Sequence, residues 1–156
     1  TCNVNFPIIK VGNWIGPLIV DAAIKKVKTV ILFGYHGKLI KLAGGIFHTH
    51  NHLADGRIEI LVYLAVKEKL PASTIVKLSN FDNLEDALLF LEKINKTLAA
   101  KLFQNLANTI EYRSFKYVNR YKKTDMEIAA IIFDRKRKIR WSGINGNDYI
   151  SFFQCD

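Results

Sequence analysis

The sequence predicts an α/β fold, with a short, mostly parallel sheet built from βαβ units, flanking helices and a late antiparallel hairpin. Two observations predict it. Apolar runs rich in β-branched residues alternate with segments of helical period, and the last two such runs are separated by a short charged turn. An α+β arrangement is the alternative. The length suits a single α/β domain over residues 1–156, and because the chain begins without methionine we expect a fragment or one domain of something longer.

The first third of the chain predicts a strand–helix–strand unit. We expect a strand over Asn5–Val11, with Pro7 at its start or on an edge. Ile15–Val27 has apolar residues at helical spacing, and Thr29–Phe33 is an unbroken apolar run that Gly34 closes. Such a run is typical of a strand buried on both faces, so the unit favours parallel strands joined by a right-handed crossover.

The middle of the chain predicts a series of helices, and its end predicts a hairpin. Helices are expected over Lys38–Phe47, Ile58–Lys69, Ala72–Leu78, a segment capped by Asn80 or Asp82, and Lys96–Tyr121. The last of these has apolar residues at four-residue steps, as in a long amphipathic helix. The hairpin joins Glu127–Phe133 to Ile139–Trp141 through the charged tip Asp134–Lys138. Gly143–Asp148 is polar and turn-rich.

The composition is basic, with 23 Lys and Arg against 14 Asp and Glu and a net charge of +9. A basic protein can bind nucleic acid, an anionic membrane surface or a small molecule with several carboxylates. No apolar run reaches the ~18 residues of a membrane span, so we expect no membrane partner. Cys2 and Cys155 lie at opposite ends without metal-binding or redox spacing, which predicts a cytoplasmic protein.

The segment from Gly34 to Lys38 lies between a predicted strand and a predicted helix. Such junctions leave backbone N–H groups free for an anion, so Gly34 and Gly37 are candidates for cofactor binding. The glycine spacing matches neither the dinucleotide fingerprint nor the phosphate loop, and an ordinary strand-to-helix turn is the alternative. Lys38 and Lys41 share a helix face and can pair with ligand carboxylates, although a solvated face explains them equally well.

All four histidines lie within a short stretch: His36, His48, His50 and His52. The last three alternate, so on a strand they would share a face and could bind a metal. No cysteine and no HExxH pattern supports such a centre, and we expect no metal bound by the protein. Proton transfer or orientation of a substrate is the more plausible role, because imidazole titrates near neutral pH.

Three charged residues also alternate just ahead of a predicted helix: Asp55, Arg57 and Glu59. Arg57 can clamp a carboxylate with two hydrogen bonds while Asp55 holds it in place, and the alternative is a helix N-cap at Asp55 with a local ion pair. Trp14 follows a glycine turn and can stack on a flat ligand, although a tryptophan in that position is more often part of the core.

A second group of basic residues lies in the later half of the chain. It indicates a nucleic-acid surface as the weaker interpretation, since no recognised nucleic-acid module accompanies it. Its members are Arg113, Lys116, Arg120, Lys122, Lys123 and Arg135–Lys138.

The first part of the chain resembles a known family. The residues that carry the resemblance are GNWIG at 12–16, LFGYHGKLIKLAGGIF at 32–47, TH at 49–50 and ADGRIE at 54–59. They resemble the cobalt-precorrin-5B C(1)-methyltransferases, the CbiD family of anaerobic cobalamin biosynthesis. Members of that family are considerably longer, so the chain resembles their carboxyl-terminal part.

The resemblance implies transfer of a methyl group from S-adenosylmethionine to carbon 1 of an anionic, cobalt-containing tetrapyrrole, with the cobalt carried by the substrate. The missing amino-terminal part is then a further partner, and the fragment alone can be inactive. We interpret His36 and His50 as catalytic, by accepting a proton, hydrogen-bonding the macrocycle or approaching its cobalt. The expected substrate-binding residues are Trp14, Lys38, Lys41, Asp55, Arg57 and Glu59. A non-catalytic basic module for nucleic acid or an anionic ligand is the alternative.

Overall fold

The computed structural model describes residues 6–153 of the chain. Its elements are α1 (Ile15–Ile24), β1 (Thr29–Tyr35), α2 (His36–Ala43), α3 (Arg57–Lys67), α4 (Ala72–Ser79), α5 (Leu84–Ile94), α6 (Lys96–Tyr121), β2 (Glu127–Phe133), β3 (Ile139–Ser142) and the 3-10 helix η1 (Gly146–Phe152). The strands form one mixed sheet, in which β1 and β2 are parallel and β2 and β3 are antiparallel. The predicted α/β class and the late antiparallel hairpin are therefore confirmed.

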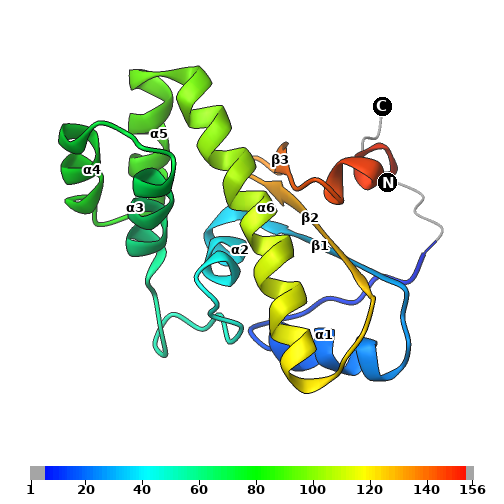
Figure 1. The fold of residues 1–156 in the computed structure, drawn as a ribbon. Coiled ribbons are helices and arrows are strands. Elements are labelled where there is room, and N and C mark those ends of the chain that lie inside the picture. The colour runs from blue at the N-terminus through cyan, green and yellow to red at the C-terminus, as the bar shows by residue number, and fades with distance from the viewer. Residues whose placement is uncertain (1–5, 154–156) are drawn as a thin grey trace.

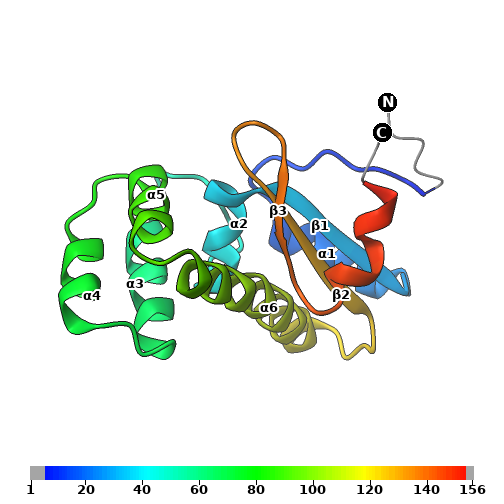
Figure 2. The same ribbon diagram turned by 90° about the horizontal axis from the view of Figure 1, so that it is seen from above.

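The helix α6 is the longest element and crosses the whole molecule beside the sheet (Figure 1). The helices α3, α4 and α5 gather at one end of it, and α1 lies at the other end, as the view from above also shows (Figure 2). The predicted bounds of this helix and of β2 are confirmed. The side chain of Asn95 caps α6 by accepting a hydrogen bond from the Leu98 amide at 3.0 Å.

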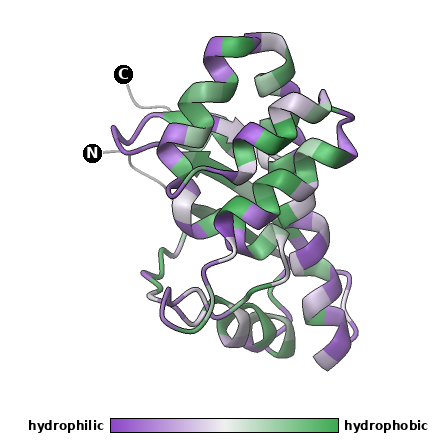
Figure 3. Cartoon of the chain, turned by 90° about the vertical axis from the view of Figure 1, so that its left-hand side faces the viewer, coloured by the Kyte–Doolittle hydropathy of each residue, from purple (hydrophilic) through white to green (hydrophobic). Residues whose placement is uncertain are grey.

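The core is formed mainly where α6, α2 and the sheet meet. The central strand β2 has a run of four residues with no exposed surface, Ala129–Ile132, because it has a strand on either side and helices over it. Apolar and polar residues alternate along the helices, as expected for helices that bury one side (Figure 3). No helix within residues 6–153 is long and apolar enough to cross a membrane.

The expected strand at the amino-terminal end is wrong for the residues that the structure describes, 6–11, which are irregular. Ile8 and Ile9 are 68% and 67% exposed, and Pro7 has no N–H to donate to a sheet. The parallel partner of β1 is instead β2, with Thr29 opposite Glu127 and Gly34 opposite Ile132. The βαβ unit predicted before Gly34 is therefore wrong, and the crossover between the two parallel strands contains α2 to α6.

Several element ends differ from the predicted ones. The first helix ends at Ile24 rather than Val27, since Lys26 is left-handed with φ of 57° and the Val27 amide donates back to the Ala22 carbonyl at 3.0 Å. Strand β1 continues through Gly34 to Tyr35, so the predicted turn is absent and α2 begins at once.

The remaining differences have local causes. The helix α2 ends before Gly44, and Gly45 has φ of 81°, a conformation that costs glycine little. Asn83, rather than Asn80 or Asp82, caps α5 by accepting from the Asp86 amide at 3.0 Å. The predicted helix Ile58–Lys69 begins one residue earlier and ends two residues earlier, and Ala72–Leu78 begins as predicted and ends one residue later. The 3-10 helix η1 occupies part of the predicted turn-rich segment. Cys2 and Cys155 lie outside the described residues.

Candidate functional site

The carboxyl ends of β1 and β2 meet at one edge of the sheet because the two strands are parallel. Ligands of open α/β sheets bind at such edges. Tyr35 is the last residue of β1, His36 is the first of α2, and Arg135 follows β2. Glu85, in the first turn of α5, lies against all three. We call these four residues the carboxyl-edge cluster.

One carboxylate oxygen of Glu85 organises the cluster. Its Oε1 lies 2.6 Å from His36 Nε2 and 3.2 Å from Arg135 Nε, and the Tyr35 hydroxyl donates to the same oxygen. Burial alone would raise the pKa of Glu85, but the hydrogen bonds from Tyr35 and His36 and the charge of Arg135 bring it below its ordinary value. Glu85 is therefore ionised at neutral pH and acts only as an acceptor.

His36 is enclosed beside this carboxylate, with 2% of its surface exposed. Burial lowers the pKa of His36 below its ordinary value, although Glu85 acts in the opposite direction. The ring is therefore neutral near pH 7, and Nε2 carries the hydrogen that the carboxylate accepts. The other nitrogen, Nδ1, is then an unprotonated acceptor, and it has no hydrogen-bond partner among residues 6–153. A carboxylate orients the imidazole of many general bases in this way, but Nδ1 of His36 is itself buried, so a substrate reaches it only when neighbouring groups move.

The two lysines of α2 are both bonded to neighbouring segments of the chain. Lys38 Nζ donates to the Gly12 carbonyl at 3.1 Å. Lys41 is fully buried, and its Nζ donates to the Thr49 carbonyl at 3.3 Å, to Asn51 Oδ1 at 2.6 Å and to the Ala54 carbonyl at 2.7 Å. All three donors of the ammonium group are thus used. Lys41 fixes the loop that contains His50, and its burial lowers its pKa.

The three alternating histidines do not converge. His48 packs edge-on against Trp14 with 4.7 Å between ring centroids, and this tryptophan is 64% exposed rather than part of the core. His50 and His52 are exposed and lie beside each other, with ring centroids 5.2 Å apart. Across the described residues, no group of three or more His, Cys, Asp or Glu side chains is placed to hold a metal ion.

Asp55 and Arg57, at the start of α3, form the local ion pair that was part of the alternative interpretation. Asp55 accepts two hydrogen bonds from Arg57, at 2.5 Å from Nε and 2.7 Å from Nη2, and these bonds lower the pKa of Asp55. The N-cap position is taken by Gly56, with φ of 61°. Asp55, Arg57 and Glu59 line a shallow groove of about 230 Å³ between the start of α3 and the start of α5.

The two glycines of the strand–helix junction are packed against side chains of their own segment. A Cβ atom on Gly37 would lie 2.5 Å from the Tyr35 ring, and one on Gly34 would lie 3.0 Å from the Leu39 side chain. Close packing therefore explains both glycines, and their assignment to a cofactor stays a prediction.

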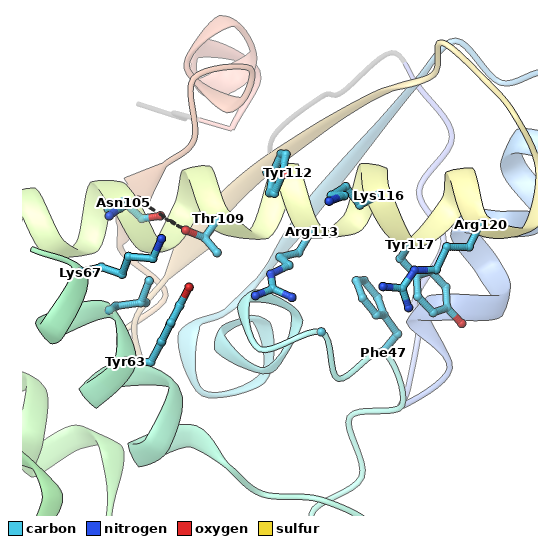
Figure 4. A pocket seen from close by; sticks show the side chains of 12 residues that line it. Phe47, Tyr63, Lys67, Asn105, Thr109, Tyr112, Arg113, Lys116, Tyr117 and Arg120 are labelled. Atoms are coloured by element: carbon cyan, nitrogen blue, oxygen red, sulfur yellow. Dashed lines mark hydrogen bonds between the residues drawn. The ribbon is translucent and has the colours of Figure 1, made fainter.

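A cleft between α3 and α6 is the feature that sequence reasoning missed. It has a volume of about 370 Å³ and combines cations with aromatic rings (Figure 4). The sequence pattern indicated the basic face of α6 but not the residues of α3 that lie opposite. We call this feature the α3–α6 cleft; the residues that line it are Gly45, Phe47, Tyr63, Leu64, Lys67, Asn105, Thr109, Tyr112, Arg113, Lys116, Tyr117 and Arg120.

The nucleic-acid interpretation combined this basic face with the hairpin tip, and the two lie far apart. Arg135 is bonded to Glu85, and Arg140 is bonded to Glu92 near the end of α5, so the hairpin lies next to the start of α6. Gln104 of α6 donates to the Ser142 carbonyl of β3, and Arg120 lies 16 residues further along the helix, roughly 24 Å away at about 1.5 Å per residue. Arg120 and the hairpin tip therefore do not lie side by side.

Comparison with protein families matches residues 48–143, more than half of the chain, to the sequence profile described as CbiD, C-terminal domain. The chain belongs to this family. The match includes α3 to α6 and both strands of the hairpin, so Glu85, Arg135 and most of the α3–α6 cleft are parts of the CbiD C-terminal domain. His36 and Lys38 precede the matched range.

Curated relatives of this CbiD chain are cobalt-precorrin-5B C(1)-methyltransferases of Prochlorococcus marinus. The protein of strain MIT 9215 is 80% identical over 99% of this chain and 42% of its own length. Those of strains MIT 9312 and MIT 9303 are 79% and 50% identical, over 98% and 93% of the chain and 41% and 38% of their own length. The chain thus spans less than half of these relatives' length. No solved structure matches it.

Proposed function

We propose that the protein containing this chain transfers a methyl group from S-adenosylmethionine to carbon 1 of cobalt-precorrin-5B, in the cytoplasmic pathway of anaerobic cobalamin biosynthesis. Membership of the CbiD family supports this, together with relatives of that name at 80% identity over 99% of the chain. The cobalt belongs to the substrate. In this proposal, residues of this chain bind the tetrapyrrole, and the amino-terminal part of the longer protein supplies the rest of the active site.

S-adenosylmethionine supplies an electrophilic methyl carbon when it is bound. Gly34 and Gly37 remain the contacts that we propose between this chain and the donor, although the side chains of Leu39 and Tyr35 lie close beside them. We propose that the rest of the donor site lies in the part of the longer protein that this chain lacks.

Of the two histidines interpreted as catalytic, His36 has the geometry that suits proton transfer. Its neutral ring is oriented by Glu85, which leaves Nδ1 as an acceptor. His50 is exposed, and its Nδ1 accepts from the His52 amide at 3.3 Å. We therefore propose that His36, oriented by Glu85, accepts the proton that the macrocycle releases when it is alkylated, while His50 contacts the macrocycle from the exposed loop. General-base catalysis of this kind contributes roughly 10²–10⁴ in rate.

The test uses the full-length protein, the methyl-labelled donor and the cobalt-loaded substrate, with His36→Gln, His50→Gln and the control His52→Gln. We expect label in the macrocycle with wild type and with the control, and a loss of at least about 100-fold in kcat for His36→Gln. Wild-type kcat falls as the pH decreases toward the lowered pKa of His36, since the base must be neutral. Full activity of His36→Gln would remove it from catalysis, and no incorporation by active wild-type preparations would disprove the function.

A further inference from the structure

The α3–α6 cleft contains four cations that have no counter-ion among the described residues 6–153. These are Lys67 on α3 and Arg113, Lys116 and Arg120 on α6 (Figure 4). Within residues 6–153 none of the four takes part in an ion pair, and no carboxylate is among the residues that line the cleft. Glu68, at the end of α3, is already bonded to Lys101 and Asn105.

The three cations of α6 lie on one side of the helix because they follow each other at steps of three and four residues. Like charges at that spacing repel one another and destabilise a helix slightly. Neither hydrogen bonds nor ion pairs within the described chain offset this repulsion, although Lys116 lies 5.3 Å from the Tyr112 ring centroid. Such an arrangement stabilises a bound anion more than it stabilises the fold.

Aromatic rings also line the α3–α6 cleft. Phe47 and Tyr117 stack with 4.0 Å between ring centroids, and Tyr63 lies on the α3 side next to Lys67. Gly16 makes room for this stack, since a Cβ atom there would lie 2.6 Å from the Tyr117 hydroxyl. Rigid aromatic faces beside cations are suited to a flat ligand that carries carboxylates.

We propose that the α3–α6 cleft binds one edge of a polycarboxylated tetrapyrrole, with its acetate and propionate arms on the four cations and its ring system against Tyr63 and the Phe47–Tyr117 stack. The volume of about 370 Å³ lies in the range of small-molecule sites and accommodates an edge with its arms rather than the whole macrocycle. This inference rests on the proposed function, because it assigns the binding of that function's tetrapyrrole substrate to named residues of the cleft.

The test measures binding of cobalt uroporphyrin, which carries acetate and propionate arms, to the full-length protein by absorbance titration. The cleft variant is Arg113→Ala/Lys116→Ala. The control is Lys122→Ala/Lys123→Ala, which removes the same charge from exposed positions just after α6 that do not line the cleft. We expect the dissociation constant to rise about tenfold for each cation removed from the cleft, and to stay near the wild-type value in the control.

If the positive charges hold the ligand, the charge-preserving variant Arg113→Lys/Lys116→Arg keeps most of the wild-type affinity for cobalt uroporphyrin. A single-stranded oligonucleotide and S-adenosylmethionine are titrated against the same proteins, because both also carry anionic groups. Equal affinity of cleft and control variants for cobalt uroporphyrin overturns the inference, and so does a cleft variant that loses only oligonucleotide or only S-adenosylmethionine.

The labelled-methyl assay on the same proteins separates this inference from the proposed function. Wild-type methyl transfer with unchanged tetrapyrrole binding by the cleft variant overturns the inference alone. Tetrapyrrole binding that depends on the cleft, in a wild type that never transfers a methyl group, supports the inference and disproves only the proposed reaction.

Discussion

The α2 region and the α3–α6 cleft differ in whether their positive charges are bonded to other groups of the described chain. In the α2 region, Lys41 has three hydrogen-bond acceptors, Lys38 has one, and Arg135 lies on Glu85. In the cleft, the cations Arg113 and Lys116 have no carboxylate partner within residues 6–153. A charge that is bonded internally contributes to folding, whereas an uncompensated one is available to a ligand. Substitutions in the two regions should therefore separate stability from binding.

The largest effect is expected for Lys41→Met, which keeps the aliphatic stem but removes the buried ammonium group. The carbonyls of Thr49 and Ala54 and the Asn51 side chain then lose their donor, and we expect the free energy of unfolding to fall by about 3 kcal/mol. Urea denaturation measures the change.

The matched control is Lys67→Ala, a cation of the cleft that is exposed. We expect its unfolding free energy to stay within about 0.5 kcal/mol of wild type. Equal losses in the two variants would contradict the comparison, because they would mean that the cleft cations also stabilise the fold.

A smaller effect is expected for His36→Gln, which weakens the bond to Glu85. We expect a loss of about 1.5 kcal/mol at pH 7. The more informative readout is the pH dependence, since burial lowers the pKa of His36 in the folded protein. Below the ordinary histidine pKa of about 6.5 the unfolded chain binds more protons, so the wild type loses stability as the pH falls from there toward the lowered folded value.

Urea denaturation at a series of pH values between about 7 and 5 tests this dependence, because ordinary carboxyl groups titrate mostly below that window. The decline should be shallower in His36→Gln. A variant with the same decline as wild type would show that another group is responsible, and His48→Gln is the control, since His48 is half-buried against Trp14 instead.

Local signals in the sequence were sufficient for much of the fold. The four-residue apolar steps of Lys96–Tyr121, and the apolar run that follows Glu127 in Glu127–Phe133, predicted both elements with their observed bounds. Asn5–Val11 failed over its described residues because a short apolar segment does not by itself supply a neighbouring strand. The predicted turn at Gly34 failed because the glycine accommodates the Leu39 side chain and does not reverse the chain.

The candidate site depended on contacts that are distant in sequence. His36 and Glu85 are 49 residues apart, and Tyr35 and Arg135 are 100 apart. Only the parallel pairing of β1 with β2 brings Arg135 to the histidine, and that pairing follows from tertiary packing. The same holds for Tyr63 on α3, which meets the basic face of α6 through helix packing. The sequence therefore predicted which residue types carry chemistry but not which of them are already bonded.

The smallest effect is expected for Asp55→Asn, which breaks the ion pair with Arg57 near the surface. Asp55 is 49% exposed, so solvent screens the pair and the unfolding free energy should change by less than about 1 kcal/mol. The substitution also frees the Arg57 guanidinium, which makes it a probe of where carboxylates bind. If the α3–α6 cleft is the tetrapyrrole site, the affinity for cobalt uroporphyrin stays within about twofold of wild type, far below the tenfold expected per cation of the cleft. Markedly tighter binding by Asp55→Asn would instead favour the groove of Arg57 and Glu59 as the tetrapyrrole site. A ligand carboxylate would then take the place of the Asp55 carboxylate on Arg57.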